Sequence, residues 1–382
     1  MLNYSVAELR MTKSKTKIYC FLASVAKGGM ERQMIIIMEQ LVARGYDVTL
    51  VTFSPRKDMY SYSGKIHRVN LASKSGGKLH SFLNIRKFFK KVVTSDDVII
   101  SFGTAINVIA LVATLGLKRH IIVGERNLTI KETKWDKLSY MLYKRVDAIV
   151  PNSYSQETFL KKRLPMMAYK ITAITNYTDV NKFRPMPELL NQESKVIIGV
   201  FARILLQKNT LGFVHALKQV VDCGYKGFKV VWYGEKASMD GVVDTYKESV
   251  LQLIQVLNLQ DYIELHPSVT DVAEKINYCD VFCLPSFREG FSNAISEAIC
   301  CGKAVLASDV SDNSIMVKEG KNGFLFNPSS EKSMADAIMR FLDLSKEEKE
   351  AMGNYSFKHS RTLFNLETFT DKYVEIINKI TK

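Results

Sequence analysis

The sequence predicts an α/β protein with two doubly wound domains, each built on a parallel sheet that helices cover on both faces. Two observations lead to this fold class. Apolar runs of strand length alternate with longer segments of helical periodicity, and the alternation starts afresh near residue 196. With 382 residues, the chain is also too long for one ordinary hydrophobic core.

The expected strands are continuous apolar runs, which is typical of strands buried on both faces. In the first half of the chain they span residues 17–25, 47–53, 97–102, 120–124 and 148–151. In the second half they span residues 196–202, 229–233, 262–265, 281–285 and 304–307. Helices are expected between them, among them 31–43, 210–223, 246–257 and 332–342.

A polar stretch over residues 179–194, which contains Pro185 and Pro187, separates the two series. It predicts the domain boundary. The expected organisation is a tail over 1–16, an N-terminal domain over 17–180, a linker over 181–194, a C-terminal domain over 195–362 and a final helix over 363–382.

The positive charge is concentrated in the first half of the chain. Residues 1–185 contain 31 Lys and Arg against 13 Asp and Glu, a net charge of +18, whereas the whole chain carries +14. Such a basic half favours an anionic membrane surface or a nucleic acid. Because no recognised nucleic-acid-binding motif accompanies the charge, we expect the membrane surface and no nucleic acid as a partner.

The sequence shows no signal peptide and no apolar run long enough to cross a bilayer. Its six cysteines are scattered and mostly lie within apolar runs, as expected of reduced thiols. We therefore expect a cytoplasmic protein that can lie peripherally on the inner face of the cytoplasmic membrane.

The most informative motif spans residues 286–298. An apolar run leads into Glu289 and Glu297, which stand eight residues apart, and a predicted helix begins near residue 294. Backbone N–H groups at a helix N-terminus favour anions, and carboxylates can bind hydroxyl groups. The motif therefore suits a phosphorylated sugar. Taken alone, an ordinary helix start with acidic residues in its first turn is the stronger interpretation.

Two cations, Arg203 and Lys208, follow the first predicted strand of the second half. The carboxyl end of a strand is where open α/β sheets bind ligands. Both residues can pair with a diphosphate, Arg as a planar fork and Lys as a point charge. Two solvated loop cations are an equally good interpretation of this pattern alone.

Two loops of the first half also follow predicted strands. Gly28 and Gly29 precede Glu31 in a spacing that matches neither a dinucleotide fingerprint nor a P-loop, so an ordinary turn is the alternative. Residues 125–127 form a polar triplet, Glu-Arg-Asn, for which a loop with a local ion pair is the alternative.

Residues 81–92 predict a helix with an aromatic-aliphatic face and a basic face. Such a helix can lie at a membrane interface, but a surface helix with its apolar stripe in the core is the favoured interpretation. The histidines have no paired spacing and no Asp-x-Asp is present, so we expect no metal and no cofactor.

Together these motifs resemble the retaining glycosyltransferases of family 4, a large group of bacterial surface-polysaccharide enzymes with the GT-B fold. The resemblance covers nearly the whole chain from about residue 17, and its specificity lies in the order and separation of the motifs. Further matching segments are residues 150–153, 174–179, 309–314 and 319–324.

The resemblance implies two Rossmann-like domains facing a cleft, with a C-terminal helix that returns to the N-terminal domain. A nucleotide-diphosphate sugar would bind mainly to the C-terminal domain. Arg203 and Lys208 would stabilise the departing diphosphate, and Glu289 would orient the transferred sugar. These three residues are the expected catalytic set.

The resemblance implies further donor contacts from the backbone amides of Gly290, Phe291 and Ser292, and it assigns Glu297 to the ribose. Gly28 and Gly29 would face the diphosphate. Many members carry a histidine where this chain has Glu125, Arg126 and Asn127. We interpret that triplet as a variant acceptor or sugar contact.

The function expected from the resemblance is metal-free transfer, with retention, of a hexose or N-acetylhexosamine. The donor would be a nucleotide sugar, with UDP as the expected nucleotide, and the acceptor a lipid-linked saccharide. Two alternatives remain open. They are a UDP-sugar 2-epimerase, which shares the fold, and a non-catalytic binder of sugar nucleotides.

Overall fold

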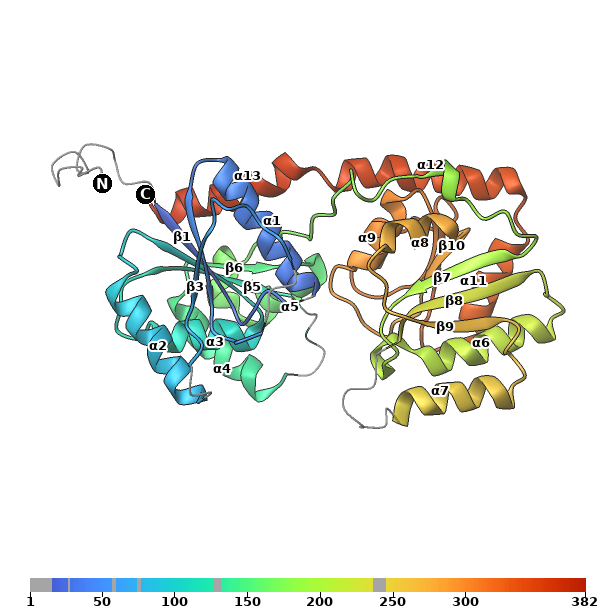
Figure 1. Ribbon diagram of the computed structural model, residues 1–382, viewed down its shortest axis with the longest axis horizontal. Helices are drawn as coiled ribbons and strands as arrows, with labels where there is room; N and C mark the ends of the chain where they lie inside the picture. The colour runs from blue at the N-terminus through green and yellow to red at the C-terminus, as the bar shows by residue number, and fades with distance from the viewer. Residues whose placement is uncertain are drawn as a thin grey trace. The chain divides into compact units, whose positions relative to one another are not determined.

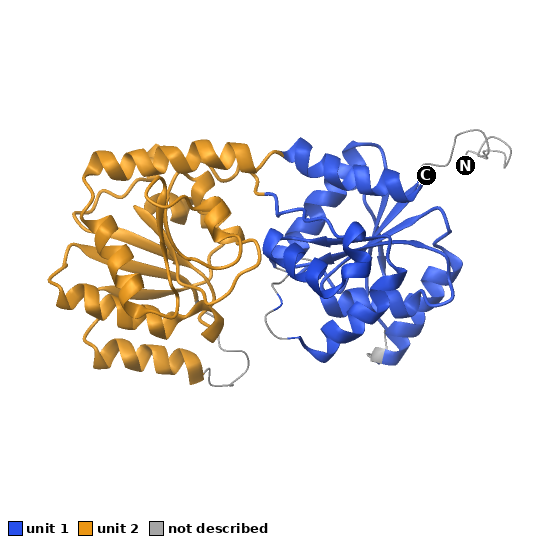
Figure 2. Cartoon of the chain, turned by 180° about the vertical axis from the view of Figure 1, so that it is seen from behind, with its two compact units in different colours: residues 1–177, 366–382 blue, residues 178–365 orange. Residues whose placement is uncertain are grey.

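The computed structural model describes residues 16–26, 28–56, 60–73, 77–126, 129, 132–235 and 245–382. The chain divides into two compact units, and Figure 2 colours them separately. Unit 1 comprises residues 1–177 and 366–382, and unit 2 comprises residues 178–365. Each unit contains a six-stranded parallel sheet with helices on both faces (Figure 1), so the predicted fold class is confirmed.

Unit 1 has the strand order β3-β2-β1-β4-β5-β6. Its strands are β1 (Lys17–Leu22), β2 (Asp47–Thr52), β3 (His67–Asn70), β4 (Val98–Phe102), β5 (His120–Glu125) and β6 (Ala148–Pro151). The strand order reverses between β1 and β4. The loops that leave these two strands therefore border the crevice where open α/β sheets bind ligands.

The helices of unit 1 are α1 (Gly29–Ala43), α2 (Lys78–Lys91), α3 (Thr104–Ala113), α4 (Lys134–Leu142), α5 (Tyr154–Arg163) and α13 (Leu366–Ile380), with 3-10 turns η2 (Tyr143–Arg145) and η3 (Pro165–Lys170). The last helix, α13, packs against α1 and buries Phe369, Tyr373 and Ile377. Helices α2, α3 and α4 lie in a row on one side of the sheet (Figure 1).

The core of unit 1 confirms the favoured interpretation of the helix at residues 81–92. Ile85 and Phe89 of α2 are buried in one cluster with Phe21 of β1 and Ile99 of β4. The apolar stripe of α2 thus packs against the sheet. None of the helices in the described parts of the chain is both long enough and apolar enough to span a membrane.

Unit 2 has the strand order β12-β11-β10-β7-β8-β9, with its reversal between β7 and β10. Its strands are β7 (Val196–Phe201), β8 (Phe228–Glu235), β9 (Ile263–Pro267), β10 (Val281–Leu284), β11 (Ala304–Ser308) and β12 (Gly323–Phe326). Its helices are α6 (Thr210–Asp222), α7 (Thr245–Val256), α8 (Val272–Tyr278), α9 (Asn293–Cys300), α10 (Asn313–Met316), α11 (Glu331–Leu342) and α12 (Lys346–Leu363), with 3-10 turns η4 (Pro187–Leu189) and η5 (Leu206–Lys208).

All ten predicted strands are present, but the edge strands β3 and β12 were not predicted. β3 has the sequence His-Arg-Val-Asn and is mostly exposed, so it lacks a continuous apolar run. β12 has only four residues and begins with a glycine, which weakens its strand signal. Exposure at the sheet edge therefore explains the weak pattern of β3, whereas β12 is mostly buried and is too short to stand out in the sequence.

Candidate functional site

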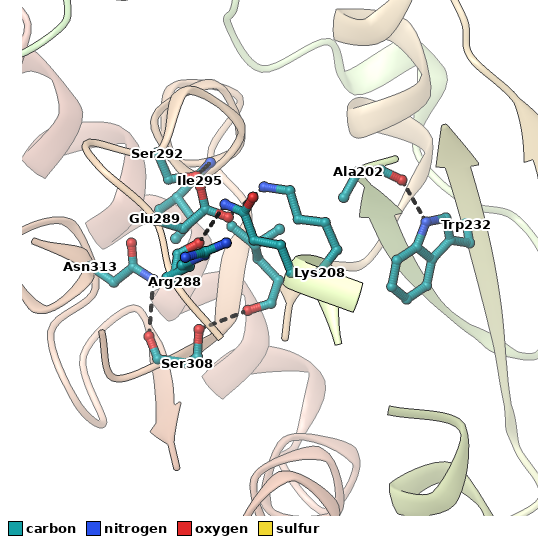
Figure 3. A network of polar contacts seen from close by, with 11 residues as sticks. Ala202, Lys208, Trp232, Arg288, Glu289, Ser292, Ile295, Ser308 and Asn313 are labelled. Carbon is teal, nitrogen blue, oxygen red and sulfur yellow. Dashed lines mark hydrogen bonds and ion pairs between the residues drawn. The ribbon is translucent and has the colours of Figure 1, made fainter. Parts of the chain in front are cut away.

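The loops after β7 and β10 meet at the carboxyl edge of the unit 2 sheet, because these strands are neighbours at the reversal of strand order. The first loop spans residues 202–209 and carries Arg203 and Lys208. The second spans residues 285–292 and carries Glu289. The structure therefore brings Lys208 and Glu289, which lie 81 residues apart in the sequence, to one place, shown in Figure 3.

Lys208 and Glu289 form an ion pair in which Nζ lies 2.5 Å from Oε1. Their side chains are only 18% and 11% exposed, so the pair is far better shielded from solvent than an ordinary surface pair. Shielding strengthens the attraction between the charges. A cation and a carboxylate predicted to bind one ligand are thus held next to each other.

Hydrogen bonds between the two loops fix the position of this pair. The backbone N–H of Phe287 donates to the carbonyl of Gln207 at 2.9 Å, and the Gln207 side chain donates to the carbonyl of Arg288 at 3.1 Å. Asn209 then ends the 3-10 turn in the left-handed conformation, at φ +54°. Its side chain donates to the carbonyl of Pro328 at 2.8 Å.

Arg203 lies at the start of the first loop, and its side chain is exposed. The preceding carbonyl, that of Ala202, accepts a 2.6 Å hydrogen bond from the buried indole of Trp232 (Figure 3). Gly234 in β8 passes so close that a Cβ there would lie 2.3 Å from the Ala202 oxygen. The backbone at residues 202–203 is therefore held in place by β8, while Arg203 itself is exposed to solvent.

The predicted amide donors lie at the N-terminus of α9. Ser292 is the N-cap residue, and its hydroxyl accepts a hydrogen bond from the N–H of Ile295 at 3.4 Å. Phe291 is buried, and its ring meets that of Phe364 edge to face at 6.2 Å between centroids. Its side chain thus serves packing within unit 2. Gly290 is half-buried, and Glu297 is buried in α9.

Four buried polar atoms at this end of unit 2 have no hydrogen-bond partner within the described part of the chain. They are Ser286 Oγ, Ser311 Oγ, Asn313 Oδ1 and Thr210 Oγ1. They follow β10, β11 and the loop after β7. Unpaired buried polar atoms are rare in folded proteins and can indicate an absent ligand. Sequence patterns do not predict these residues, because isolated hydroxyl and amide side chains have no distinctive spacing.

In unit 1, the glycine loop leads from β1 into α1. The Gly28 N–H donates to the Tyr60 hydroxyl at 3.3 Å, and that hydroxyl donates to the Gly28 carbonyl at 3.0 Å. Gly29 is the first residue of α1. Burial raises the pKa of the Glu31 carboxyl at this helix start. Lys27, which precedes the glycines, lies outside the described residues.

Glu125 is the last residue of β5, and its carboxylate is buried and bound by neighbouring side chains. Tyr143 donates a short hydrogen bond to it, Thr104 donates at 2.9 Å, and Asn107 donates at 3.4 Å. Burial raises the pKa of Glu125, although these donors oppose the shift. Burial and the nearby Glu125 charge raise the pKa of Tyr143 well above its usual value.

Arg126 extends toward α13. Its guanidinium donates to the Tyr373 hydroxyl at 2.9 Å and lies 3.5 Å from the centroid of the Phe102 ring. The neighbouring Asn127 lies outside the described residues. Both described members of the triplet are therefore engaged in internal contacts at the carboxyl edge of the unit 1 sheet. Among the described residues, no group of three or more His, Cys, Asp or Glu side chains could hold a metal ion.

Comparisons with known proteins identify the class of protein that this fold and site define. Residues 27–182 match the model described as Glycosyltransferase Family 4, and residues 181–359 match that described as Glycosyl transferases group 1. Together the two matches cover most of the chain. The chain belongs to the GT-B glycosyltransferases of the bacterial surface-polysaccharide type.

Two curated relatives are similar over nearly their whole length. An uncharacterized glycosyltransferase of Haemophilus influenzae is 24% identical over 86% of this chain and 90% of its own. The N-acetylgalactosamine-N,N'-diacetylbacillosaminyl-diphospho-undecaprenol 4-alpha-N-acetylgalactosaminyltransferase of Campylobacter jejuni is 24% identical over 86% of this chain and 91% of its own.

Solved structures show the same fold. Sucrose-phosphate synthase of Thermosynechococcus elongatus superposes with a TM-score of 0.82 at 17% identity, covering 96% of this chain and 99% of that one. Anabaena HepE in complex with UDP and glucose superposes with a TM-score of 0.79 at 18% identity, covering 95% of this chain and 100% of that one.

Proposed function

We propose that this glycosyltransferase transfers a hexose or N-acetylhexosamine from a UDP sugar to a lipid-linked saccharide, with retention and without a metal. The observation that carries the proposal is the shielded Lys208–Glu289 pair at the carboxyl edge of unit 2, beside the N-terminus of α9. The Campylobacter relative is named for a diphospho-undecaprenol acceptor, and HepE was solved with UDP and glucose. Both names support this choice of donor and acceptor.

In the proposed complex, the diphosphate binds next to Lys208 and Arg203. When the bond between the sugar C1 and the β-phosphate oxygen breaks, its electron pair goes to that oxygen, and the two cations stabilise the charge that appears there. The acceptor oxygen then bonds to C1 on the same face. The leaving phosphate takes the acceptor proton, so no protein base is assigned.

The Lys208–Glu289 pair suggests how both residues change partners. The diphosphate brings negative charge close to Lys208. This charge weakens the attraction between the Lys208 ammonium and the Glu289 carboxylate. Glu289 can then accept hydrogen bonds from sugar hydroxyls, with the backbone N–H groups of residues 290–292 as further donors. In the absence of the donor, Lys208 and Glu289 are each paired with an opposite charge.

The buried hydroxyls extend this donor site. We assign Ser286, Ser311 and Thr210 to hydrogen bonds with the phosphates or the sugar, because a hydroxyl can donate as well as accept. Glu297 keeps its assignment to the ribose hydroxyls. Its carboxylate stands on α9, the helix that the second loop leads into.

In unit 1, the contribution of Gly28 and Gly29 to donor binding stays a prediction. The internal hydrogen bonds of Glu125 favour a positioning role, in which its carboxylate orders Thr104 and Tyr143 beside the acceptor. Arg126 and Asn127 keep their assignment as acceptor or sugar contacts. The basic charge of the first half supports peripheral binding to an anionic membrane.

The test is a transfer assay with a panel of UDP sugars, an undecaprenyl-diphosphate-linked saccharide and excess chelator. We expect a product with the α-anomeric configuration of the donor, at a rate that the chelator does not change, and loss of transfer in Glu289→Ala. An inverted product or dependence on a metal would overturn those parts of the proposal. Epimerisation at C2 without acceptor would show a different enzyme class.

A further inference from the structure

We propose that one face of unit 1, the α2–α4 face, docks on an anionic lipid surface, with α4 as its apolar anchor. The α2–α4 face consists of the exposed sides of α2, α3 and α4. The inference rests on the proposed function, since a lipid-linked acceptor requires an enzyme at the membrane. It goes further by assigning the surface that makes the contact.

Most of the large exposed apolar side chains of unit 1 lie on or next to α2, α3 and α4, while Tyr154, Met166 and Tyr169 lie on α5 and η3. On α4, Trp135 is 51% exposed and Met141 is 70% exposed, and on α2, Leu79 is 68% exposed. Leu83 and Leu138 are exposed as well. Helix α3 packs against both α2 and α4, so these side chains share one side of the sheet (Figure 1). Apolar side chains gathered in this way mark interaction sites.

The three exposed apolar residues of α4 form a stripe because they are spaced by three along the helix. Trp135, Leu138 and Met141 face solvent, whereas Ser139 and Tyr140 on the other side are buried. A capping box, in which Thr133 and the Asp136 side chain each bond the other's backbone N–H, defines where α4 begins. Because the capping box fixes the start of α4, the three exposed apolar side chains keep their places along this helix.

The charge around the stripe matches an anionic surface. Helix α2 contains five basic residues and no acidic one, and Lys87, Lys90 and Lys91 are exposed. On α4, Lys134 and Lys137 are exposed beside the stripe. The one acidic residue of α4, Asp136, is occupied in the capping box.

The combination of apolar and basic side chains favours a lipid surface. Each Lys or Arg near an anionic membrane adds about 1 kcal/mol of attraction, or roughly fivefold in affinity. Apolar side chains add to this by entering the headgroup region.

The position of the stripe suits the proposed reaction. Helices α2, α3 and α4 each begin at the carboxyl edge of the sheet, because each leaves a loop that follows a strand. Leu79 and Trp135 lie in the first turns of α2 and α4. Gly28 and Arg126 occupy the same edge of unit 1. Docking through this face brings that edge close to the headgroups, where the saccharide of a lipid-linked acceptor emerges.

The test compares Trp135→Ser/Leu138→Ser/Met141→Ser with the wild type by flotation with vesicles of phosphatidylglycerol and phosphatidylcholine. We expect the variant to bind the vesicles at least about tenfold more weakly. The control is Leu251→Ser/Val256→Ser, which removes exposed apolar side chains from α7 of unit 2 and should bind like the wild type. Because all five positions are exposed, each variant should keep the thermal unfolding midpoint of the wild type.

Charge is tested separately with Lys134→Glu/Lys137→Glu, for which we expect binding weakened by about tenfold or more. The control is Lys332→Glu/Lys358→Glu, which reverses two exposed charges on unit 2. Wild-type vesicle binding by both unit 1 variants would overturn the proposal. So would sedimentation that shows the serine variant converting a dimer of this chain to monomers.

Vesicle binding needs no turnover, and transfer to a detergent-solubilised acceptor needs no vesicle. Unchanged transfer by the unit 1 variants to the solubilised acceptor, together with lost vesicle binding, supports the docking face. Absence of transfer by the wild type contradicts the proposed function. In that case, vesicle binding by the wild type and the variants still tests the docking face.

Discussion

At the residue scale, the candidate site depends on a contact that joins two distant motifs. Lys208 lies in a 3-10 turn after β7, and Glu289 lies in the loop after β10. Both were predicted from the sequence as ligand-binding residues, but their ion pair was not. Pairing requires the neighbouring positions of β7 and β10 in the sheet, and one sequence does not reveal strand order.

Lys208→Met should lower kcat/KM by about 100-fold or more, because it removes a cation from the site where charge develops and leaves the largely shielded Glu289 without its partner. Steady-state kinetics with the preferred donor measure the effect. Lys226→Met, at an exposed lysine in the turn before β8, is the control and should have wild-type kinetics. A loss below about threefold in Lys208→Met would remove Lys208 from the catalytic set.

Glu125→Gln should change how stability depends on pH. Burial raises the pKa of Glu125, so the folded chain holds this proton more tightly than the unfolded chain. In the wild type this carboxyl therefore contributes stability at low pH and loses it as pH rises through the folded-state pKa.

The glutamine variant lacks this titration. Relative to it, the wild type should gain free energy of unfolding when the pH falls from about 7 to about 5. Urea denaturation at the two pH values measures the difference. A difference that does not vary with pH would contradict the predicted direction of the shift.

Other site residues became visible only in the structure. The unpaired hydroxyls of Ser286 and Ser311 have no sequence signal, because serine is common in loops and its role depends on what surrounds it. The internal role of Glu125 likewise depends on Thr104 and Tyr143, which other elements supply.

At the element scale, the short loops after β7 and β10 are held by backbone contacts as well as by side chains. Trp232 and Gly234, both in β8, support the backbone at Ala202 from the neighbouring strand. The sequence predicted β8 as a strand. The importance of its glycine follows from its φ of +136° and its close approach to the β7 loop.

Gly234→Ala should destabilise unit 2 by about 1–3 kcal/mol and weaken donor binding, because the new Cβ meets the Ala202 carbonyl and the backbone conformation disfavours a side chain. Denaturation and donor titration measure the two effects. Gly227→Ala is the control: a Cβ there meets no heavy atom within 4 Å, and the free energy of unfolding should change little. Equal effects at both positions would refute the steric explanation.

For helix α13, the sequence pattern predicts the helix but not the contacts that place it in unit 1. The sequence predicts a final helix over residues 363–382, and the observed helix spans Leu366–Ile380. Its place in unit 1 depends on contacts such as the hydrogen bond between Tyr373 and Arg126 and the ion pair between Arg44 and Asp371. Both pairs join residues more than 240 positions apart.

At the scale of the whole molecule, we propose that unit 2 binds the donor. The reversal of strand order between β7 and β10 defines the crevice, and Arg203, Lys208 and Glu289 border it. Addition of UDP should therefore slow amide hydrogen exchange in peptides covering residues 202–209 and 285–297. Protection confined to unit 1 would contradict this assignment.

The exchange experiment has an internal control in α12, residues 346–363, which lies outside the proposed donor site. Its exchange should not change beyond the small general stabilisation that any ligand of the native state produces. A uniform change over all of unit 2 would indicate such stabilisation without locating the site.

The sequence by itself determined the fold class, ten of the strands and the residue types of the candidate site. These follow from local patterns: apolar runs, helical periodicity, and polar residues after strands. The tertiary structure decided which loops meet, which carboxylate pairs with which cation, and which apolar side chains face solvent on α2 and α4. The physical reason is that pairing and burial depend on strand order and packing between distant segments, which local patterns leave undetermined.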